Sequence, residues 1–495
     1  MFDFKGLIDA LMRRAREEEG QGPSATQLLI DLPRNESLAV LTEIIKALAA
    51  LNRNPRIGLK ERYRAVQGFD DKARPLAAIL IRVFRGEEQV EGLSARQVLP
   101  SVLACWRELA SAYKLCLKQH AQAPSPRFAN DAELITLRAI NYYAEQAKWA
   151  YLRYFEAEPR LWRSLNRLYQ IAEAAGFAQK TIPPYMGQPA TSVSQLYRHA
   201  LLLKLAEPER RRIEDIWLID RQLRDWVAQV SLEKVIRPRD QVFAVNLDEP
   251  KPPTKLRRNM VGERYRYLDT EPLSASLNEL SHAAARGSLP ASFDPCCNQQ
   301  EQDNLARLLQ DLAMVYSRTG QARSRRNERR HREKTAATAI GLARIARALA
   351  GSEKDWEPWN MADESASGLG AHYKAQFDDK LAIGELLAFR EDSHIQLAVV
   401  RRLHKSREGQ VKVGAERLAT QPVAVSLQDG ELAVAALYCA DSPHGRMLLL
   451  PAEDYETGRE YLLIAGPKRF SITLGPLLEA LPEYVVSGFS VHGKH

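Results

Sequence analysis

The chain has 495 residues, of which 45% are hydrophobic and 27% charged, a balance typical of a globular protein with more than one core. The longest dense apolar run, residues 76–84, contains Arg82 and is too short to span a membrane, and the N-terminus leaves no room for the apolar region of a signal peptide. The formal net charge of +8 indicates an anionic partner, which leaves nucleic acid, a lipid surface and a phosphorylated small molecule open.

Five cysteines are scattered along the chain, with Cys296 and Cys297 adjacent and no C-x-x-C pair. This usage argues against a disulfide framework or a zinc site and favours a reducing compartment. We therefore expect a cytoplasmic protein without a metal centre.

Residues 1–235 are expected to form an all-α domain, because apolar residues recur there at helical spacing. Prolines at 124–126 and 183–184 break the pattern, since proline removes a backbone donor and blocks helix continuation. The expected helices cover residues 36–51, 59–86, 95–120, 131–157, 159–176, 193–206 and 208–232.

Residues 236–320 are interpreted as either a small α+β domain or an irregular connector, and composition does not choose between them. Residues 241–247 alternate like a strand, residues 264–268 form a second candidate strand, and a proline-rich loop lies at 249–253. A well-defined amphipathic helix is predicted at residues 299–318, followed by Gly320 as its stop.

Beyond Gly368 the chain is predicted to be β-rich, with many short strands separated by glycine, proline, aspartate and serine. Such a series is typical of a barrel or sandwich, or of two in tandem. We place one β domain at residues 321–425 and a C-terminal β extension at 426–495. The expected strands cover residues 386–390, 395–403, 410–418, 423–427, 432–438, 446–450, 461–464, 470–474 and 484–489.

An arginine-dense segment at residues 322–332 precedes this β region. Its arginines recur four apart as R-x-x-x-R, and the sequence does not decide which of two pairs is used. Arginine donates paired hydrogen bonds that suit phosphate oxygens or the O6/N7 edge of guanine. The two candidate pairs are Arg325 with Arg329, and Arg326 with Arg330.

A second motif, D-x-S-x-x-G, follows at residues 363–368. The Asp363 carboxylate can accept from guanine N1–H and N2–H₂, and the Ser365 hydroxyl can donate or accept. Gly368 permits a tight turn or a close backbone approach. Either motif alone is weak, but the two in this order, ahead of strands, form a specific combination.

Together these motifs resemble the PilZ family, six-stranded barrels that bind cyclic di-GMP in bacteria. The resemblance covers roughly residues 321–425 and extends to a glycine-marked strand entry at 381–390 and a hairpin at 398–403 and 413–418. It implies a multidomain α+β chain, in which a helical N-terminal region precedes a PilZ-like antiparallel β-barrel and further C-terminal β structure. It also implies that the arginines, Asp363, Ser365 and Gly368 bind cyclic di-GMP.

One departure from the family concerns the spacing from Arg330 to Asp363, which is longer than usual. Residues 336–350 read as partly helical, so that an insertion either leaves the site intact as a loop or marks a degenerate domain. Ligand binding would order the arginine segment and alter domain docking or partner binding.

The resulting hypothesis is a cyclic di-GMP receptor that is not an enzyme, needs no cofactor and engages an unknown protein partner through its helical N-terminal region. No P-loop, H-E-x-x-H or G-x-S-x-G signature occurs in the sequence, and no catalytic or metal-binding residue is assigned. By family analogy, the output would concern pili, motility or surface attachment. Two alternatives remain: a PilZ-like adaptor that has lost its ligand, and a nucleic-acid-binding regulator using the arginine segment, which is the less favoured.

Overall fold

The computed structural model describes residues 36–494 except 91–92, 94, 297, 321–329, 376–380, 393, 431, 443–444 and 482. The chain divides into two compact units. The first comprises the chain up to Ala150, with Ala157–Lys204 and Leu223–Asp269, and the second comprises Tyr151–Glu156, Leu205–Gln222 and the chain from Thr270 onward. Helices followed by antiparallel barrels confirm the expected α+β multidomain class. The four-part division at residues 235, 320 and 425 stays a prediction.

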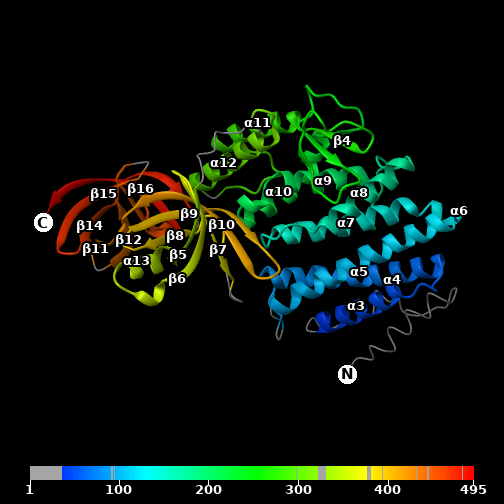
Figure 1. Cartoon of the computed structure of the whole chain (residues 1–495), viewed down its shortest axis with the longest axis horizontal. Helices are drawn as coiled ribbons and strands as arrows, with labels where there is room; N and C mark the ends of the chain where they lie inside the picture. Colours follow the sequence, from blue (N-terminus) through cyan, green and yellow to red (C-terminus); the bar gives the residue numbers. More distant parts are fainter. Residues whose placement is uncertain are drawn as a thin grey trace. The chain divides into compact units, whose positions relative to one another are not determined.

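The N-terminal half is helical, as expected, and runs from blue to green in Figure 1. Apolar residues at helical spacing are buried along these helices, and α7 (Ala132–Tyr151) is buried on most of its surface. This burial supplies most of the stability of helices in a folded protein. Within the described residues no helix is both long and apolar enough to cross a bilayer. The helices are α3 Ser37–Arg53, α4 Leu59–Phe84, α5 Ala95–Gln122, α6 Pro126–Ala129, α7 Ala132–Tyr151, α8 Pro159–Ala174, α9 Val193–Leu205 and α10 Ile213–Trp226.

Two helices are shorter than expected. The helix predicted at 131–157 ends at Tyr151, because Tyr154 adopts a left-handed backbone conformation (φ 59°) that a right-handed helix cannot contain. The helix predicted at 208–232 is shorter at both ends: Pro208 opens only a 3-10 turn, and α10 itself begins at Ile213.

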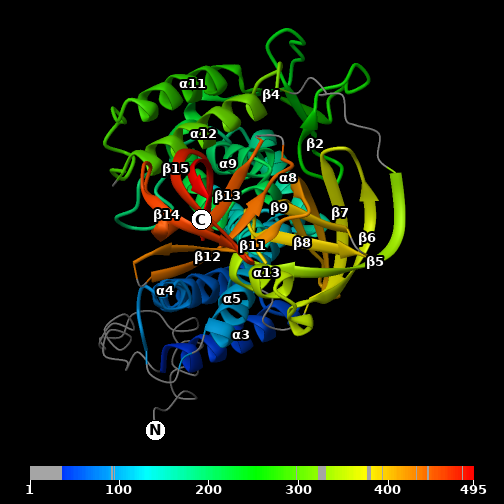
Figure 2. The same ribbon diagram turned by 90° about the vertical axis from the view of Figure 1, so that its left-hand side faces the viewer.

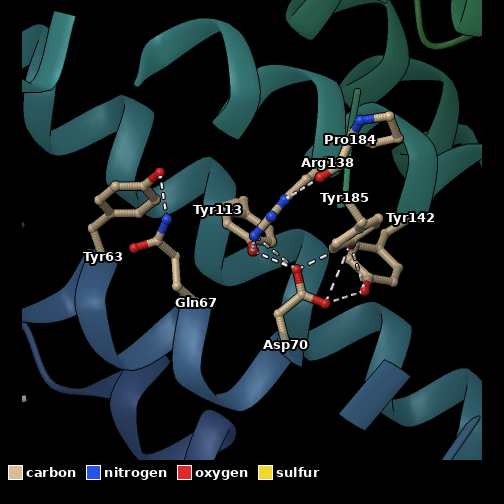
Figure 3. Close-up of polar contacts among 8 residues, drawn as sticks. All are labelled: Tyr63, Gln67, Asp70, Tyr113, Arg138, Tyr142, Pro184 and Tyr185. Carbon is tan, nitrogen blue, oxygen red and sulfur yellow. Dashed lines mark hydrogen bonds and ion pairs between the residues drawn. The ribbon is translucent and has the colours of Figure 1, made fainter. Parts of the chain in front are cut away.

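The core of the first unit contains a fully buried carboxylate, Asp70 of α4, which has several polar partners (Figure 3). Hydroxyl groups of three tyrosines donate to it, at 2.5 Å from Tyr113 and 3.0 Å from Tyr185, with Tyr142 as the third. The Arg138 guanidinium lies 3.5 Å away. Burial nevertheless raises the pKa of Asp70 above its ordinary value.

Residues 231–269 form a four-stranded antiparallel sheet in the order β1-β4-β2-β3. Composition left two interpretations open from residue 236 onward, whereas β1 lies at the end of the region expected to be helical. The predicted strands at 241–247 and 264–268 are confirmed as β2 and β4. The sheet is tied to α8 by the Asn166 side-chain amide, which donates to the carbonyls of Asn246 and Glu249. The strands are β1 Ser231–Glu233, β2 Phe243–Asn246, β3 Thr254–Lys255 and β4 Tyr265–Asp269.

The second unit contains a helical hairpin of α11 Glu271–Ala285 and α12 Gln299–Tyr316. The predicted amphipathic helix is confirmed as α12, and the Asn298 side chain caps it by accepting from the Glu301 N–H. Hydroxyls of Ser274 and Ser281 on α11 donate to backbone carbonyls of α12, both at 2.8 Å. The hairpin is therefore closely packed.

Two closed six-stranded antiparallel barrels follow. All predicted strands from residue 386 onward are confirmed within a few residues, except that β15 and β16 are longer. The first barrel contains β5 Arg330–Ile340, β6 Glu357–Glu364, β7 Gly368–Lys374, β8 Leu386–Glu391, β9 His394–Lys405 and β10 Gln410–Thr420. The second contains β11 Val423–Asp429, β12 Leu432–Cys439, β13 Met447–Pro451, β14 Glu460–Ala465, β15 Lys468–Ala480 and β16 Tyr484–Lys494.

A short helix, α13 Leu342–Leu349, connects β5 to β6 and contacts both barrels (Figure 2). The partly helical interpretation of residues 336–350 is confirmed by α13, whereas residues 336–340 belong to β5, whose pairing with β6 and β8 overrides the helix preference of alanine. Leu342, Ile345 and Ala346 are buried in one apolar cluster with residues of both barrels.

A segment from the N-terminal half also belongs to the second unit. The Tyr154 ring is 4% exposed and lies in the apolar core of the first barrel. Its carbonyl accepts from the Lys405 N–H at 2.8 Å, and its hydroxyl donates to the Arg211 carbonyl at 3.2 Å. These contacts hold the connector between α7 and α8 against the first barrel.

The Tyr484 hydroxyl of the second barrel donates to the Gly384 carbonyl, and the next residue, Glu385, is half-buried. Burial, with the charge of Glu483 as a smaller contribution, raises its pKa from 4.5 to about 7. This carboxyl binds its proton more tightly in the folded than in the unfolded chain, so wild-type stability falls as pH rises from about 4.5 to about 7. Glu385→Gln should remove that fall and raise the free energy of unfolding at pH 8 by about 1 to 2 kcal/mol, allowing for solvent screening.

Chemical denaturation at pH 5 and pH 8 measures this effect. Glu408→Gln, at an exposed position in the turn between β9 and β10, is the control. Equal pH dependence in wild type and Glu385→Gln would contradict the prediction.

Candidate functional site

The residues of the predicted site fall in two groups. Arg325, Arg326 and Arg329 lie outside the described residues. Arg330 is the exposed first residue of β5. Asp363 lies near the end of β6, Ser365 in the following turn and Gly368 at the start of β7.

The long spacing from Arg330 to Asp363 is bridged by strand pairing. β5 and β6 are antiparallel neighbours, in which Arg330 pairs with Glu364 and His331 with Asp363. The intervening residues form the rest of β5, α13 and most of β6, so they are neither a loop nor a break in the barrel. The end of the arginine segment and the acidic motif are therefore adjacent.

The D-x-S-x-x-G motif forms the tip of the β6–β7 hairpin. The Ser365 N–H donates to the Gly368 carbonyl at 2.8 Å, and the Ser365 hydroxyl donates to the same oxygen at 3.3 Å. A methyl group at Gly368 would lie 3.3 Å from the Ala415 carbonyl of β10. Of the two reasons offered for this glycine, the structure supports the close backbone approach.

Asp363 belongs to a row of residues that pair directly across neighbouring strands. In order, the row is formed by His331 of β5, Asp363 of β6, Gly370 of β7, Gly414 of β10 and Arg402 of β9. Paired residues share one face of a sheet, and the next row, which includes Met361, Ala371, Val413 and Leu403, is buried in the barrel core. The row therefore lies on the outer surface of the barrel. It places two adjacent glycines between an acid and an arginine.

Gly370 makes room for the acidic side chain. A β-carbon at this position would lie 2.8 Å from the nearer carboxylate oxygen of Asp363. The carboxylate thus lies over the glycine backbone of the neighbouring strand. Sequence reasoning missed this residue, although the spacing Gly368-x-Gly370 within a strand is a signal for close approach.

Gly370→Ala should therefore displace the Asp363 carboxylate and impair whatever the site binds while leaving the barrel folded. We expect binding to weaken by about 5- to 150-fold, the loss of one good paired contact to a base. Titration calorimetry with the ligand proposed below measures the effect. Gly68→Ala, where the added methyl meets no atom within 4 Å, is the control, and unchanged affinity in Gly370→Ala would contradict this role.

A further arginine, Arg417 of β10, holds the hairpin tip. Its backbone N–H donates to the Ser367 carbonyl at 3.0 Å, its guanidinium donates to the Ala366 carbonyl at 3.1 Å, and it forms an ion pair with Glu364. No sequence signal links Arg417 to the motif, because their proximity arises from the pairing of β7 with β10.

The surface thus offers a carboxylate and a glycine floor, with His331 at one end of the row and the basic Arg402 at the other. Arg330 precedes His331 on β5 and pairs with Glu364 in a neighbouring row. Among the described residues, no three histidine, cysteine or acidic side chains are grouped as metal ligands. This arrangement suits hydrogen bonding and charge pairing to a flat, anionic molecule.

Comparison with known proteins points in the same direction. The family model described as "Cyclic-di-GMP receptor FimW, N-terminal domain" matches residues 23–239. A curated relative, the cyclic-di-GMP receptor FimW of Pseudomonas aeruginosa, is 26% identical over 264 residues. That alignment covers 51% of this chain and 42% of FimW, so it spans well under half of the relative. No solved structure matches the chain.

The family match ends before β5. It relates the helical half of this chain to FimW and does not extend to the first barrel. The family-model match and the candidate site therefore lie in different parts of the chain, since the matched residues precede β5 and the site lies on the strands of the first barrel.

Proposed function

We propose that this protein is a bacterial cyclic di-GMP receptor whose ligand binds on the outer face of the first barrel. The observation that carries the proposal is the row His331–Asp363–Gly370–Gly414–Arg402 on the outer face of the first barrel. The row begins on β5, the strand that continues the arginine segment. The similarity of the helical half to FimW and the resemblance of the motifs to the PilZ family support the same ligand.

The carboxylate and the glycines of the row suit a guanine base, and the arginine segment suits the phosphates of the dinucleotide. The Asp363 carboxylate accepts from the N1–H and N2–H₂ groups of guanine, which present two donors side by side. The glycine floor admits a flat base close to the backbone. Arginines of the basic segment, Arg325 with Arg329 or Arg326 with Arg330, bind phosphates and guanine edges.

Signal output is the second part of the proposal. The protein is a cytoplasmic receptor and not an enzyme, and binding at the barrel changes domain docking or the affinity for a protein partner of the helical region. Control of pili, motility or surface attachment is the process that the family resemblance indicates.

Calorimetric titration of the full chain with cyclic di-GMP, GTP and a short DNA duplex tests the ligand. We expect binding of cyclic di-GMP that weakens by about 5- to 150-fold in Asp363→Ala, because one paired contact to guanine is lost. Asp441→Ala, in the corresponding hairpin of the second barrel, is the matched control and should leave affinity unchanged.

The alternatives predict different titrations. A flat cyclic di-GMP titration would overturn the receptor and favour an adaptor without ligand. Sequence-indifferent DNA binding that falls steeply with salt would favour a nucleic-acid regulator.

A further inference from the structure

The two barrels have the same strand order. Numbered from its first strand, each barrel closes in the cyclic order 1-2-3-6-5-4, with all pairs antiparallel. A shared closed order of six strands is a strong topological identity, because many other orders would close a barrel equally well. The second barrel is therefore a copy of the first in fold, which its sequence does not reveal.

The hairpin between strands 2 and 3 carries a related sequence in both barrels. In the second barrel it contains Ser442 and Gly445 at the S-x-x-G spacing, and the Ser442 hydroxyl donates to the Gly445 carbonyl at 2.6 Å. In the first barrel Ser365 donates to Gly368 in the same way. The two hairpins thus share the hydrogen bond from the serine hydroxyl to the glycine carbonyl.

The acidic residue is not retained. Two positions before Ser442, where the first barrel has Asp363, the second has Ala440. Two positions after Gly445, where the first barrel has Gly370, the second has Met447, which is fully buried. The carboxylate and the glycine that makes room for it have been replaced together.

The outer face of these strands is used differently in the two barrels. In the second barrel, Leu437, Cys439, Met447 and Leu449 alternate with core residues and are buried in the cluster that joins the barrels. In the first barrel, the equivalent face carries the Asp363 row. One copy presents this face to solvent, whereas the other covers it with apolar contacts.

The second barrel packs against β8 and β9 of the first barrel and against α13. This helix has been inserted between strands 1 and 2 of the first barrel, whereas the second barrel has only residues 430–431 at that position. Ile345 and Ala346 of α13 lie in the shared cluster with Met447. The helix also connects the two strands that carry Arg330 and Asp363.

We propose that the second barrel is a duplicate of the first that has exchanged its nucleotide face for a docking face on α13, so that each chain holds cyclic di-GMP at one barrel only. This inference rests on the proposed function for its ligand. The inference that the second barrel uses this face to dock on α13 does not depend on any ligand.

Matched serine substitutions test the single site. In calorimetric titrations of the full chain with cyclic di-GMP, Ser365→Ala should weaken binding by about 2- to 10-fold, the effect of one hydrogen bond, whereas Ser442→Ala should change nothing. Asp363→Ala should leave no second, unaffected class of sites. Weakened binding in Ser442→Ala, or a residual class in Asp363→Ala, would overturn the single-site inference.

Hydrogen exchange tests the docking part without ligand. Met447→Ala should accelerate amide exchange in residues 342–349 by about tenfold or more, because it opens a cavity against α13. Met314→Ala, at an exposed position of α12, is the control. Unchanged amide exchange of α13 in Met447→Ala would overturn the docking face. If wild type gave a flat titration with cyclic di-GMP, the proposed function and the single-site inference would both be overturned. The hydrogen-exchange result would still test the docking of the second barrel on α13.

Discussion

Replacing Asp70 with alanine is expected to lower the free energy of unfolding of the helical unit by about 3 to 5 kcal/mol. The carboxylate is fully buried, and its removal leaves the Arg138 charge without its counter-ion. The hydroxyls of Tyr113, Tyr142 and Tyr185 lose their common acceptor in the same step (Figure 3). Leaving buried donors unpaired costs more than the net gain of forming the bonds.

Urea denaturation followed by circular dichroism measures this loss. Asp71→Ala is a matched control, because Asp71 is the next residue of the same helix and is exposed. A difference below about 1 kcal/mol between the two variants, within the range of ordinary surface substitutions, would show that the cluster is not central to the unit.

Tyr154→Ala is expected to destabilise the second unit by a similar amount, about 3 to 5 kcal/mol, because it empties a space in the core of the first barrel. Tyr154 shares that buried cluster with Trp359 and Phe389. Alanine gives no compensating relief of the left-handed backbone, since it tolerates that conformation no better than tyrosine does.

Tyr154→Phe separates packing from hydrogen bonding. It keeps the ring and removes the hydroxyl, which donates to the Arg211 carbonyl, so we expect a loss of about 1 kcal/mol. Thermal unfolding of both variants, followed by near-ultraviolet circular dichroism, measures the difference. Equal losses in the two variants would locate the stabilisation in the hydroxyl and contradict the packing account.

The strands from residue 386 onward were predictable because short apolar stretches alternate with clear glycine, proline, aspartate and serine turn signals. β5 was not, since its alanine-rich stretch at 336–340 has no such alternation and owes its strand conformation to pairing with β6 and β8. The end of α7 was missed for a related reason: the helical pattern continues past Tyr151, and only the contact of Tyr154 with the barrel interrupts it.

The candidate site shows the same division between local and non-local information. Asp363, Ser365 and Gly368 were recognisable because they lie within one hexapeptide. Gly414 and Arg402 lie far along the chain and join the row only through the register of β10 with β7 and β9. A register is set by the whole barrel, so no local pattern could have indicated these two residues.

The contacts of Tyr154 with the first barrel have a consequence for folding during synthesis. A ribosome completes the helical half long before it reaches Lys405, the backbone partner of Tyr154. Until the first barrel closes, the Tyr154 ring lacks the apolar residues that bury it. The connector between α7 and α8 therefore reaches its final packing only after the barrel has folded. Residues 23–239, which match the FimW family model, therefore contain Tyr154, whose packing partners in the first barrel are synthesised later. A fragment that ends at residue 239 would expose the Tyr154 ring to solvent.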